Sequence, residues 1–270
     1  MKITDIPVIT SKDNSKLKLA RSVRDGRESD LIFVEGVRLV EELLRSPLKG
    51  RTVFASESAG DKLTHSLSEF SRSGAEINVI ASKIFDSITD TKNSQGIVVL
   101  ADRPQPREYA DAFASEGLLV FLHQAGNPSN LGAIIRTAEA AGARSVLISP
   151  GSADAFSPKS LRSSMGSAFR QSLCTGAGLE DAVRLAKANG YRTIAADIGA
   201  SRPYTQCDLH RRTMLVFGSE AHGLDRDYLK LIDEKVFIPM ENGVESLNLA
   251  VSAGILLFEA KRQRDMAATG

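Results

Sequence analysis

The second half of the chain alternates short apolar runs with segments of helical pattern, and this alternation restricts the possible folds more than any other feature. Apolar runs of about five residues bounded by polar or glycine-containing turns are typical of buried strands. Helical crossovers between such strands join parallel neighbours in a sheet. We therefore expect an α/β fold with a mostly parallel sheet and helices on both faces. The predicted strands cover residues 118–124, 145–149, 193–197, 214–218 and 235–239.

A smaller α/β pattern fills the first part of the chain. Residues 101–116 contain two prolines and several charges but little apolar periodicity, which is typical of a linker. A chain of 270 residues also exceeds one average domain. We therefore expect two domains, residues 1–106 and residues 107–270. In the first, strands are predicted at residues 31–35, 53–56, 77–80 and 96–101, and helices at residues 37–45 and 61–72.

The composition, with 42% hydrophobic and 25% charged residues, is that of an ordinary globular protein. A formal charge of +1 decides neither for nor against a nucleic-acid partner, because acids elsewhere can offset a local basic patch. No run of about 18 apolar residues occurs and residues 1–10 have no apolar signal core, so we expect a cytoplasmic protein that spans no membrane. Cys174 and Cys207 have no CxxC spacing and the four histidines are scattered, so we expect neither a disulfide scaffold nor a metal site.

Residues 12–27 have the pattern of a basic amphipathic helix, with six Lys or Arg side chains and an apolar face of Leu17, Ala20 and Val23. A solvated surface helix would account for these charges. The alternative is contact with nucleic-acid phosphates, each of which adds salt-dependent affinity when it is neutralised. The candidates for such contacts are Lys16, Arg21 and Arg24.

The first of three polar stretches is NLGAIIRT, which starts at Asn130. It predicts a helix in which Ser129 or Asn130 is the N-cap. At about 100° per residue, Arg136 lies away from the apolar stripe, so packing does not require it. It is therefore either half of an exposed pair with Glu139 or a group that grips a phosphate or carboxylate bidentately.

The second stretch is FGSEAHGLD, which begins at Phe217. Gly218 and Gly223 are five residues apart, as in a phosphate-binding loop, but Leu224 stands where that loop needs a lysine, so a P-loop is rejected. A glycine-bounded loop then follows a parallel strand, where open α/β sheets bind ligands. Glu220 either pairs with an arginine, caps a helix or serves that ligand site.

The third stretch is IPMENGVESLNLA, from Ile238 to Ala250. It predicts the end of a strand, a polar loop and the start of a long apolar helix, with Ser246 as a plausible cap. Asn248 is expected inside the first helical turns, where its propensity is poor and its amide needs a partner. A polar ligand at the start of this helix would supply one.

Together and in this order, N-x-G-x-x-x-R, F-G-x-E-x-x-G and I-P-M…S-L-N resemble the signature of the SpoU/TrmH family of RNA ribose 2'-O-methyltransferases, in the SPOUT class. The resemblance covers residues 118–260, and residues 157–166 are similar to an intervening loop of the family. FVEGVRLVEELL in the first half is similar to the family's small substrate-binding domain, which has a ribosomal-protein-like fold.

The resemblance implies a C-terminal SPOUT domain with a trefoil knot, S-adenosylmethionine as cofactor, RNA as partner and a homodimer with the site near the subunit interface. The implied reaction is 2'-O-methylation of a ribose in structured RNA. The two-domain layout favours 23S ribosomal RNA, and the alternatives are a tRNA 2'-O-methyltransferase or an inactive RNA-binding module.

The resemblance also implies which residues act. The family gives Arg136 a base-like role, but a guanidinium does not readily lose a proton, so we expect Arg136 to stabilise the developing alkoxide instead, while Glu220, a phosphate or water receives the proton. The implied catalytic set is Asn130, Arg136, Glu220, Ser246 and Asn248. The implied cofactor-binding set is Phe217, Gly218, Ile238, Met240, Ser246 and Leu247.

Overall fold

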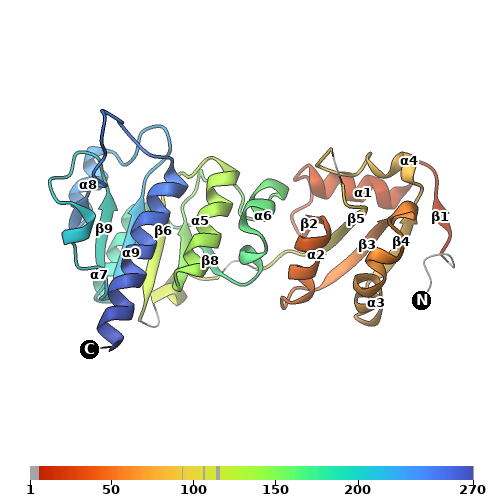
Figure 1. Ribbon diagram of the computed structural model, residues 1–270, viewed down its shortest axis with the longest axis horizontal. Coiled ribbons are helices and arrows are strands. Elements are labelled where there is room, and N and C mark those ends of the chain that lie inside the picture. The colour runs from red at the N-terminus through yellow and green to blue at the C-terminus, as the bar shows by residue number, and fades with distance from the viewer. Residues whose placement is uncertain (1–5, 93, 106, 114–115, 270) are drawn as a thin grey trace. The chain divides into compact units, whose positions relative to one another are not determined.

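The computed structural model describes residues 6–269 except residues 93, 106 and 114–115. The chain forms two compact units, and Figure 1 shows the elements of each. The first consists of Met1–Gln105 and Ala155–Arg170, and the second of Pro106–Asp154 and Gln171–Gly270. The predicted domain boundary falls at Pro106, which lies outside the described residues.

The first unit is built on a mixed five-stranded sheet in the order β1-β4-β3-β5-β2. Strand β5 is antiparallel to both of its neighbours, whereas β4 is parallel to β1 and β3. The carboxyl ends of β2, β3 and β4 therefore lie at the same edge as the start of β5. The strands are β1 (Val8–Ile9), β2 (Leu31–Glu35), β3 (Gly50–Ser56), β4 (Glu76–Ile80) and β5 (Ile97–Asp102).

Helices cover this sheet, and the first of them has the predicted amphipathic pattern. It buries Leu17, Ala20 and Val23 in a core with Phe33 and Phe54. The helical elements are α1 (Ser15–Arg24), α2 (Val37–Leu44), η2 (Glu57–Leu63), α3 (Thr64–Arg72), α4 (Ser82–Phe85), α6 (Pro158–Ser164) and η4 (Ser167–Phe169).

The segment Ala155–Arg170 belongs to the first unit, although the chain enters and leaves it from strands of the second. Arg162 forms an ion pair with Asp90 at 2.6 Å, and the Arg103 guanidinium lies 5.2 Å from the centre of the Phe156 ring. The predicted boundary assigns this segment to the second domain. Contacts between charged residues far apart in the sequence do not change the local periodicity. The sequence pattern therefore could not assign this segment to the first unit.

The second unit is built on six parallel strands in the order β11-β9-β10-β6-β7-β8. The predicted parallel sheet is therefore confirmed, and β8 is a strand that the sequence did not predict. The strands are β6 (Leu118–Leu122), β7 (Ala143–Ile148), β8 (Ser172–Thr175), β9 (Arg192–Ala196), β10 (Thr213–Phe217) and β11 (Glu234–Val236).

Helices lie on both faces of this sheet, as predicted. On one face α7 packs over Leu119, Phe121 and Val216, while α5 and α9 pack against each other on the opposite face. The trefoil knot implied by the resemblance stays a prediction. The helical elements are η3 (Tyr109–Phe113), α5 (Pro128–Ala140), α7 (Leu179–Ala188), η5 (Tyr204–Gln206), α8 (Arg226–Leu231) and α9 (Leu249–Thr269). None of the helices in the described part of the chain is long and apolar enough to cross a membrane.

Candidate active site

The strand order creates a crevice between β6 and β10. The chain leaves β6 through α5 toward β7 on one side, and it leaves β10 through α8 toward β11 on the other. The register pairs Leu122 with Phe217, so the two strands end side by side. Open α/β sheets bind ligands where neighbouring connections diverge in this way.

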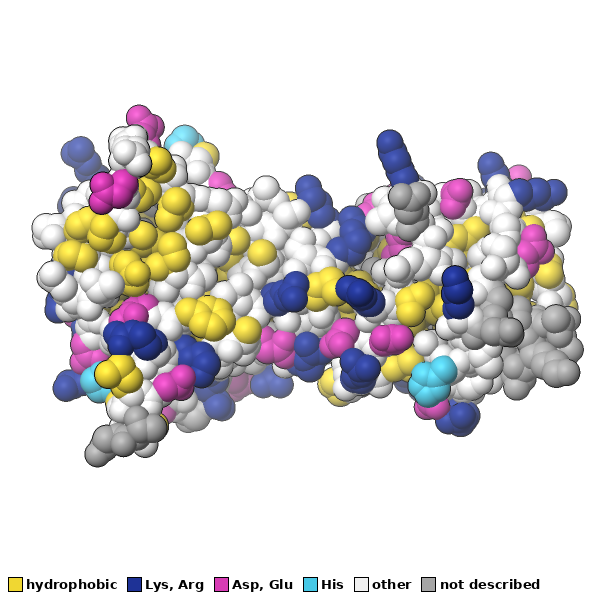
Figure 2. Space-filling view, viewed as in Figure 1, with side chains coloured by type: hydrophobic (Ala, Val, Ile, Leu, Met, Phe, Trp, Pro, Cys, Tyr) yellow, Lys and Arg dark blue, Asp and Glu magenta, His cyan; other side chains and the backbone are white. Residues whose placement is uncertain are grey.

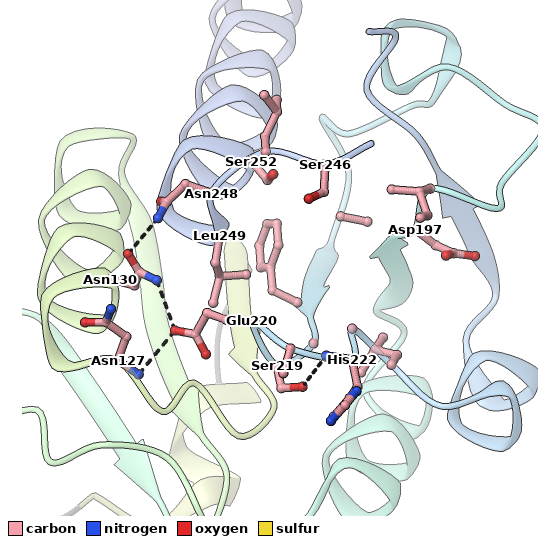
Figure 3. Close-up of a pocket in the computed structure, with 18 of the residues that line it drawn as sticks. Asn127, Asn130, Asp197, Ser219, Glu220, His222, Ser246, Asn248, Leu249 and Ser252 are labelled. Atoms are coloured by element: carbon pink, nitrogen blue, oxygen red, sulfur yellow. Dashed lines mark hydrogen bonds between the residues drawn. The ribbon is translucent and has the colours of Figure 1, made fainter. Parts of the chain in front are cut away.

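A pocket of about 710 Å³ occupies this position. Figure 3 shows Asn130, Glu220 and Asn248 along one side of it and Asp197 on the opposite side. The lining residues follow four strands: Asn127 and Asn130 after β6, Ala196 to Ile198 after β9, residues 217–224 at the end of and after β10, and residues 245–249 with Ser252 after β11.

A hydrogen-bond network joins the three polar stretches at the pocket. Glu220 accepts hydrogen bonds from the backbone amides of Gly126 at 3.1 Å and Asn127 at 3.2 Å. Its Oε1 also accepts from Asn130 Nδ2 at 3.0 Å. Asn130 Oδ1 in turn accepts from Asn248 Nδ2 at 3.0 Å. The network fixes Asn130 from both sides (Figure 3).

The environment of Glu220 keeps its carboxylate ionised. Partial burial alone would raise the pKa, but hydrogen bonds from the Asn130 side chain and from backbone amides, including those of Asn127 and Gly126, outweigh it and lower the pKa of Glu220. A carboxylate with a lowered pKa and occupied lone pairs is a poor proton acceptor. The geometry therefore favours a positioning role for Glu220.

Helix α5 is capped by Asn127, whose Oδ1 accepts the backbone N–H of Ser129 at 2.9 Å. The prediction that Ser129 or Asn130 is the cap is wrong. Pro128 occupies the first helical turn, where its missing N–H costs nothing, and the cap falls on the residue before it. Asn130 thereby becomes free for the network.

Asn248 is the residue that caps α9, because its Oδ1 accepts the backbone N–H of Ala250 at 2.9 Å. It precedes the helix, which begins at Leu249, so the predictions that Ser246 caps this helix and that Asn248 lies inside it are wrong. The capping oxygen leaves Nδ2 to donate to Asn130. Asn248 therefore ties the start of α9 to α5.

The loop after β10 closes on itself through two backbone hydrogen bonds. Ser219 N donates to Gly223 O at 3.0 Å, and Gly223 N donates to Ser219 O at 2.9 Å. A Cβ atom added at Gly218 would lie 2.1 Å from the carbonyl carbon of Gly223. Only glycine allows this closure, which places bare backbone at the pocket wall.

Four of the residues expected to bind cofactor line the pocket, and two do not. Strand β11 ends at Val236, so Ile238 and Met240 lie in the loop beyond it, half-buried and outside the lining. Those that line the pocket are Phe217, Gly218, Ser246 and Leu247.

Sequence reasoning missed several polar lining residues, namely Asp197, His222 and Ser252. Asp197 follows the strand next to β10, and this strand was predicted. The signal that could have found Asp197 is therefore its place at a carboxyl strand end beside the crevice.

Arg136 does not line the pocket. It follows Asn130 on α5 by six residues, about 240° further around the helix, and its side chain is exposed. No described residue pairs with Arg136, so the first of the two alternatives, an exposed pair with Glu139, is not formed. The guanidinium is left available to a ligand or a partner.

The basic side chains of α1 already have partners within the unit. Lys16 forms an ion pair with Glu76 at 2.6 Å, and Arg24 forms one with Asp25 at 2.8 Å. Arg21 donates to a backbone carbonyl at 2.8 Å. The role of these three residues in binding RNA stays a prediction.

Among the residues that the structure describes, no group of three His, Cys, Asp or Glu side chains could hold a metal ion.

The chain belongs to the SpoU rRNA methylase family. Residues 117–258, more than half of the chain, match the model of that family. Residues 33–107 match a second model, described as RNA 2'-O ribose methyltransferase substrate binding.

Relatives and solved structures resemble the chain over nearly its whole length. It is 28% identical over 256 residues to the 23S rRNA (guanosine(2553)-2'-O)-methyltransferase RlmP of Bacillus subtilis, covering 94% of this chain and 98% of the relative. It is 29% identical over 231 residues to the 23S rRNA (guanosine-2'-O-)-methyltransferase RlmB of Bordetella pertussis, covering 84% and 94%. The AdoMet-bound rRNA methyltransferase from Sinorhizobium meliloti superposes with a TM-score of 0.85 at 28% identity, covering 95% and 98%.

Proposed function

We propose that this protein transfers a methyl group from S-adenosylmethionine to the 2'-hydroxyl of a ribose in 23S ribosomal RNA. One observation carries the proposal: Glu220, Asn130 and Asn248, from three distant stretches, form a single network at the pocket. The relatives RlmP and RlmB, whose names state this reaction, support the substrate class. The intact network argues against an inactive RNA-binding module. We expect the enzyme in the cytoplasm, where its substrate is made.

The pocket fits this cofactor. The acidic residues Asp197, Glu220 and Glu245 are among those that line it, which suits a ligand that carries a sulfonium and an ammonium group. Gly218 brings backbone to the wall without a side chain. Phe217, Ser246 and Leu247 supply apolar and hydroxyl contacts, so these residues would hold it together with Gly218. When bound, S-adenosylmethionine supplies an electrophilic methyl group.

The protein has to align the ribose hydroxyl and help it to lose its proton. Asn130 is held by Glu220 and Asn248, so its position is fixed before substrate binds. Ser246 adds a hydroxyl to the lining of the same pocket. Arg136 can grip a substrate phosphate bidentately and stabilise the developing alkoxide. With Glu220 occupied, the RNA phosphate or water receives the proton.

We infer that Arg136 serves the pocket of a second copy of the chain. Its side chain lies outside the lining of its own pocket, whereas α5 packs against α9, whose Val251 and Phe258 are each 50% exposed. These two residues are seven apart and share one helix face. Figure 2 shows hydrophobic side chains gathered on this side of the second unit. A second copy packed on this face would cover them and bring in Arg136.

The activity is tested by mapping ribose methylation in ribosomal RNA from cells with and without the gene. We expect one 2'-O-methyl group to be missing from 23S RNA without the gene. Purified protein and S-adenosylmethionine should restore it on the unmodified RNA. Loss confined to tRNA would establish the tRNA alternative. Unchanged methylation in all RNA, with no transfer in vitro, would establish the inactive module.

We expect Gly218→Ala to weaken S-adenosylmethionine binding by at least about tenfold, because the new Cβ would lie 2.1 Å from the Gly223 carbonyl carbon and force the loop out of place. Gly178→Ala is the matched control, since no atom lies within 4 Å of a Cβ at that position. Calorimetry on the full chain measures affinity and circular dichroism monitors the fold. Equal affinity of a folded Gly218→Ala protein would contradict the proposed cofactor wall.

A further inference from the structure

The first unit contains a hollow of about 360 Å³ that lies wholly within it. The hollow is at the sheet edge where β2 ends, and it is lined by Glu35, Gly36, the loop residues Thr91, Lys92 and Gln95, and Arg162 from α6. Its size is that of a single nucleotide and far below that of a duplex.

Two cationic side chains reach this hollow. Lys92 is exposed and has no ion pair with any described residue. Arg162 pairs with Asp90 at 2.6 Å through one nitrogen and is one-third exposed, so its planar guanidinium keeps other donors for a ligand. The contact of Arg103 with Phe156, 5.2 Å from the ring centre, anchors the segment that carries Arg162.

The remaining lining residues build a fixed polar wall. Glu35 is 6% exposed and accepts hydrogen bonds from the Asp90 amide at 2.7 Å and from the Thr91 hydroxyl, which holds the loop in place. Gln95 Oε1 accepts the Val37 N–H at 2.7 Å, and this fixes its amide with the NH₂ group left to donate.

Gly36 keeps the hollow open. Its φ of 95° strains any side chain, and a Cβ there would lie 3.1 Å from Gln95 Oε1. The backbone at the end of β2 therefore forms a wall without a side chain, against which a planar base can lie.

We propose that this hollow binds one unpaired nucleotide of the RNA substrate, with Lys92 and Arg162 on its phosphate and the Gln95 amide on the base edge. Proteins read RNA sequence mainly from unpaired, splayed bases, and donors to phosphate set the affinity. The basic side chains of α1, by contrast, are engaged with partners of their own. The inference rests on the proposed function, since it concerns the RNA of that reaction.

The test compares the double variant Lys92→Ala/Gln95→Glu with the wild type. Glutamate at position 95 keeps an oxygen to accept the Val37 N–H, so the start of α2 is preserved, while the added charge repels phosphate. Lys49→Ala is the matched control, because Lys49 is exposed and precedes β3 at the opposite edge of the sheet. The probe is unmodified 23S RNA transcribed in vitro.

We expect the double variant to raise the KM for RNA at least about tenfold, with unchanged S-adenosylmethionine affinity and an unchanged single-turnover rate at saturating RNA. The slope of log affinity against log salt should fall by about 0.7 for each lost contact to single-stranded phosphate. Lys49→Ala should match the wild type in both. If the double variant keeps the wild-type KM and salt slope while the wild type methylates the RNA, the hollow is not an RNA site. If the wild type itself transfers no methyl group, the proposed function fails instead.

Discussion

Replacing Arg136 by alanine should lower the single-turnover rate of methyl transfer by at least about 10²–10³-fold, the usual effect of removing one group that stabilises developing negative charge. The fold should persist, because Arg136 is exposed and surface substitutions typically change stability by no more than about 0.5 kcal/mol. Cofactor affinity should also persist, since Arg136 lies outside the pocket lining. The assay is tritiated methyl incorporation into unmodified 23S RNA, with calorimetry for the cofactor.

Arg136→Lys separates charge from geometry. An ammonium keeps the positive charge but cannot reproduce a planar, bidentate grip on phosphate, so this variant should also fail. Near wild-type rates for Arg136→Ala would show that Arg136 is only a surface residue.

Mixed dimers decide whether Arg136 acts on its own pocket or on that of a second copy. One subunit carries Arg136→Ala and the other carries Asn130→Ala, each with a different affinity tag so that the heterodimer is isolated. If Arg136 acts across the interface, the pocket of the first subunit receives the intact Arg136 of the second, and one of the two sites works. If Arg136 acts within its own chain, the heterodimer is as inactive as either parent. A protein that stays monomeric at assay concentration would exclude the arrangement altogether.

Local pattern predicted most of the fold, because burial and backbone geometry act over a few residues at a time. The apolar runs that form β6, β7, β9 and β10 could be located from the sequence pattern alone. Strand β8 (Ser172–Thr175) was not predicted because it has only four residues and begins and ends with polar side chains. The membership of Ala155–Arg170 in the first unit was not predicted, because it depends on contacts with residues far away in the sequence, such as the ion pair of Arg162 with Asp90.

The sequence predicted which stretches of the chain form the site, but not which side chains form hydrogen bonds with each other there. Glycine and polar residues at strand ends marked the loops, and the register of β6 against β10 then placed Asn130 beside Glu220. The predicted N-cap residues were wrong because several Asn and Ser residues lie close together at the start of both helices. Capping propensity alone does not distinguish among them. The orientation of Arg136 away from the pocket follows from the direction of α5, which packing against α9 determines.

Asn130→Asp should reduce turnover by about a hundredfold or more, although the side chain keeps its size. Asn130 Nδ2 donates to Glu220 Oε1 at 3.0 Å, and an aspartate would place a second carboxylate at that distance. Residue 130 is 8% exposed, so the new carboxylate would lose most of its hydration and the Asn130–Glu220 hydrogen bond as well, and we expect a loss of roughly 1–3 kcal/mol in stability. Thermal unfolding and the single-turnover assay measure the two effects.

The double variant Asn130→Asp/Glu220→Gln distinguishes positioning from proton transfer at Glu220. This double variant exchanges donor and acceptor across the 3.0 Å contact between positions 130 and 220. The glutamine NH₂ at position 220 can donate to the new carboxylate at position 130. The glutamine oxygen can still accept a backbone N–H of the Gly126–Asn127 turn. If Glu220 only positions Asn130 and this turn, the exchange should recover much of the stability and part of the rate lost in Asn130→Asp. An amide accepts no proton at neutral pH, so a Glu220 that received the hydroxyl proton would leave the double variant as inactive as Glu220→Gln alone, despite restored stability. Recovery of stability without any recovery of rate would therefore contradict a role for Glu220 that is confined to positioning.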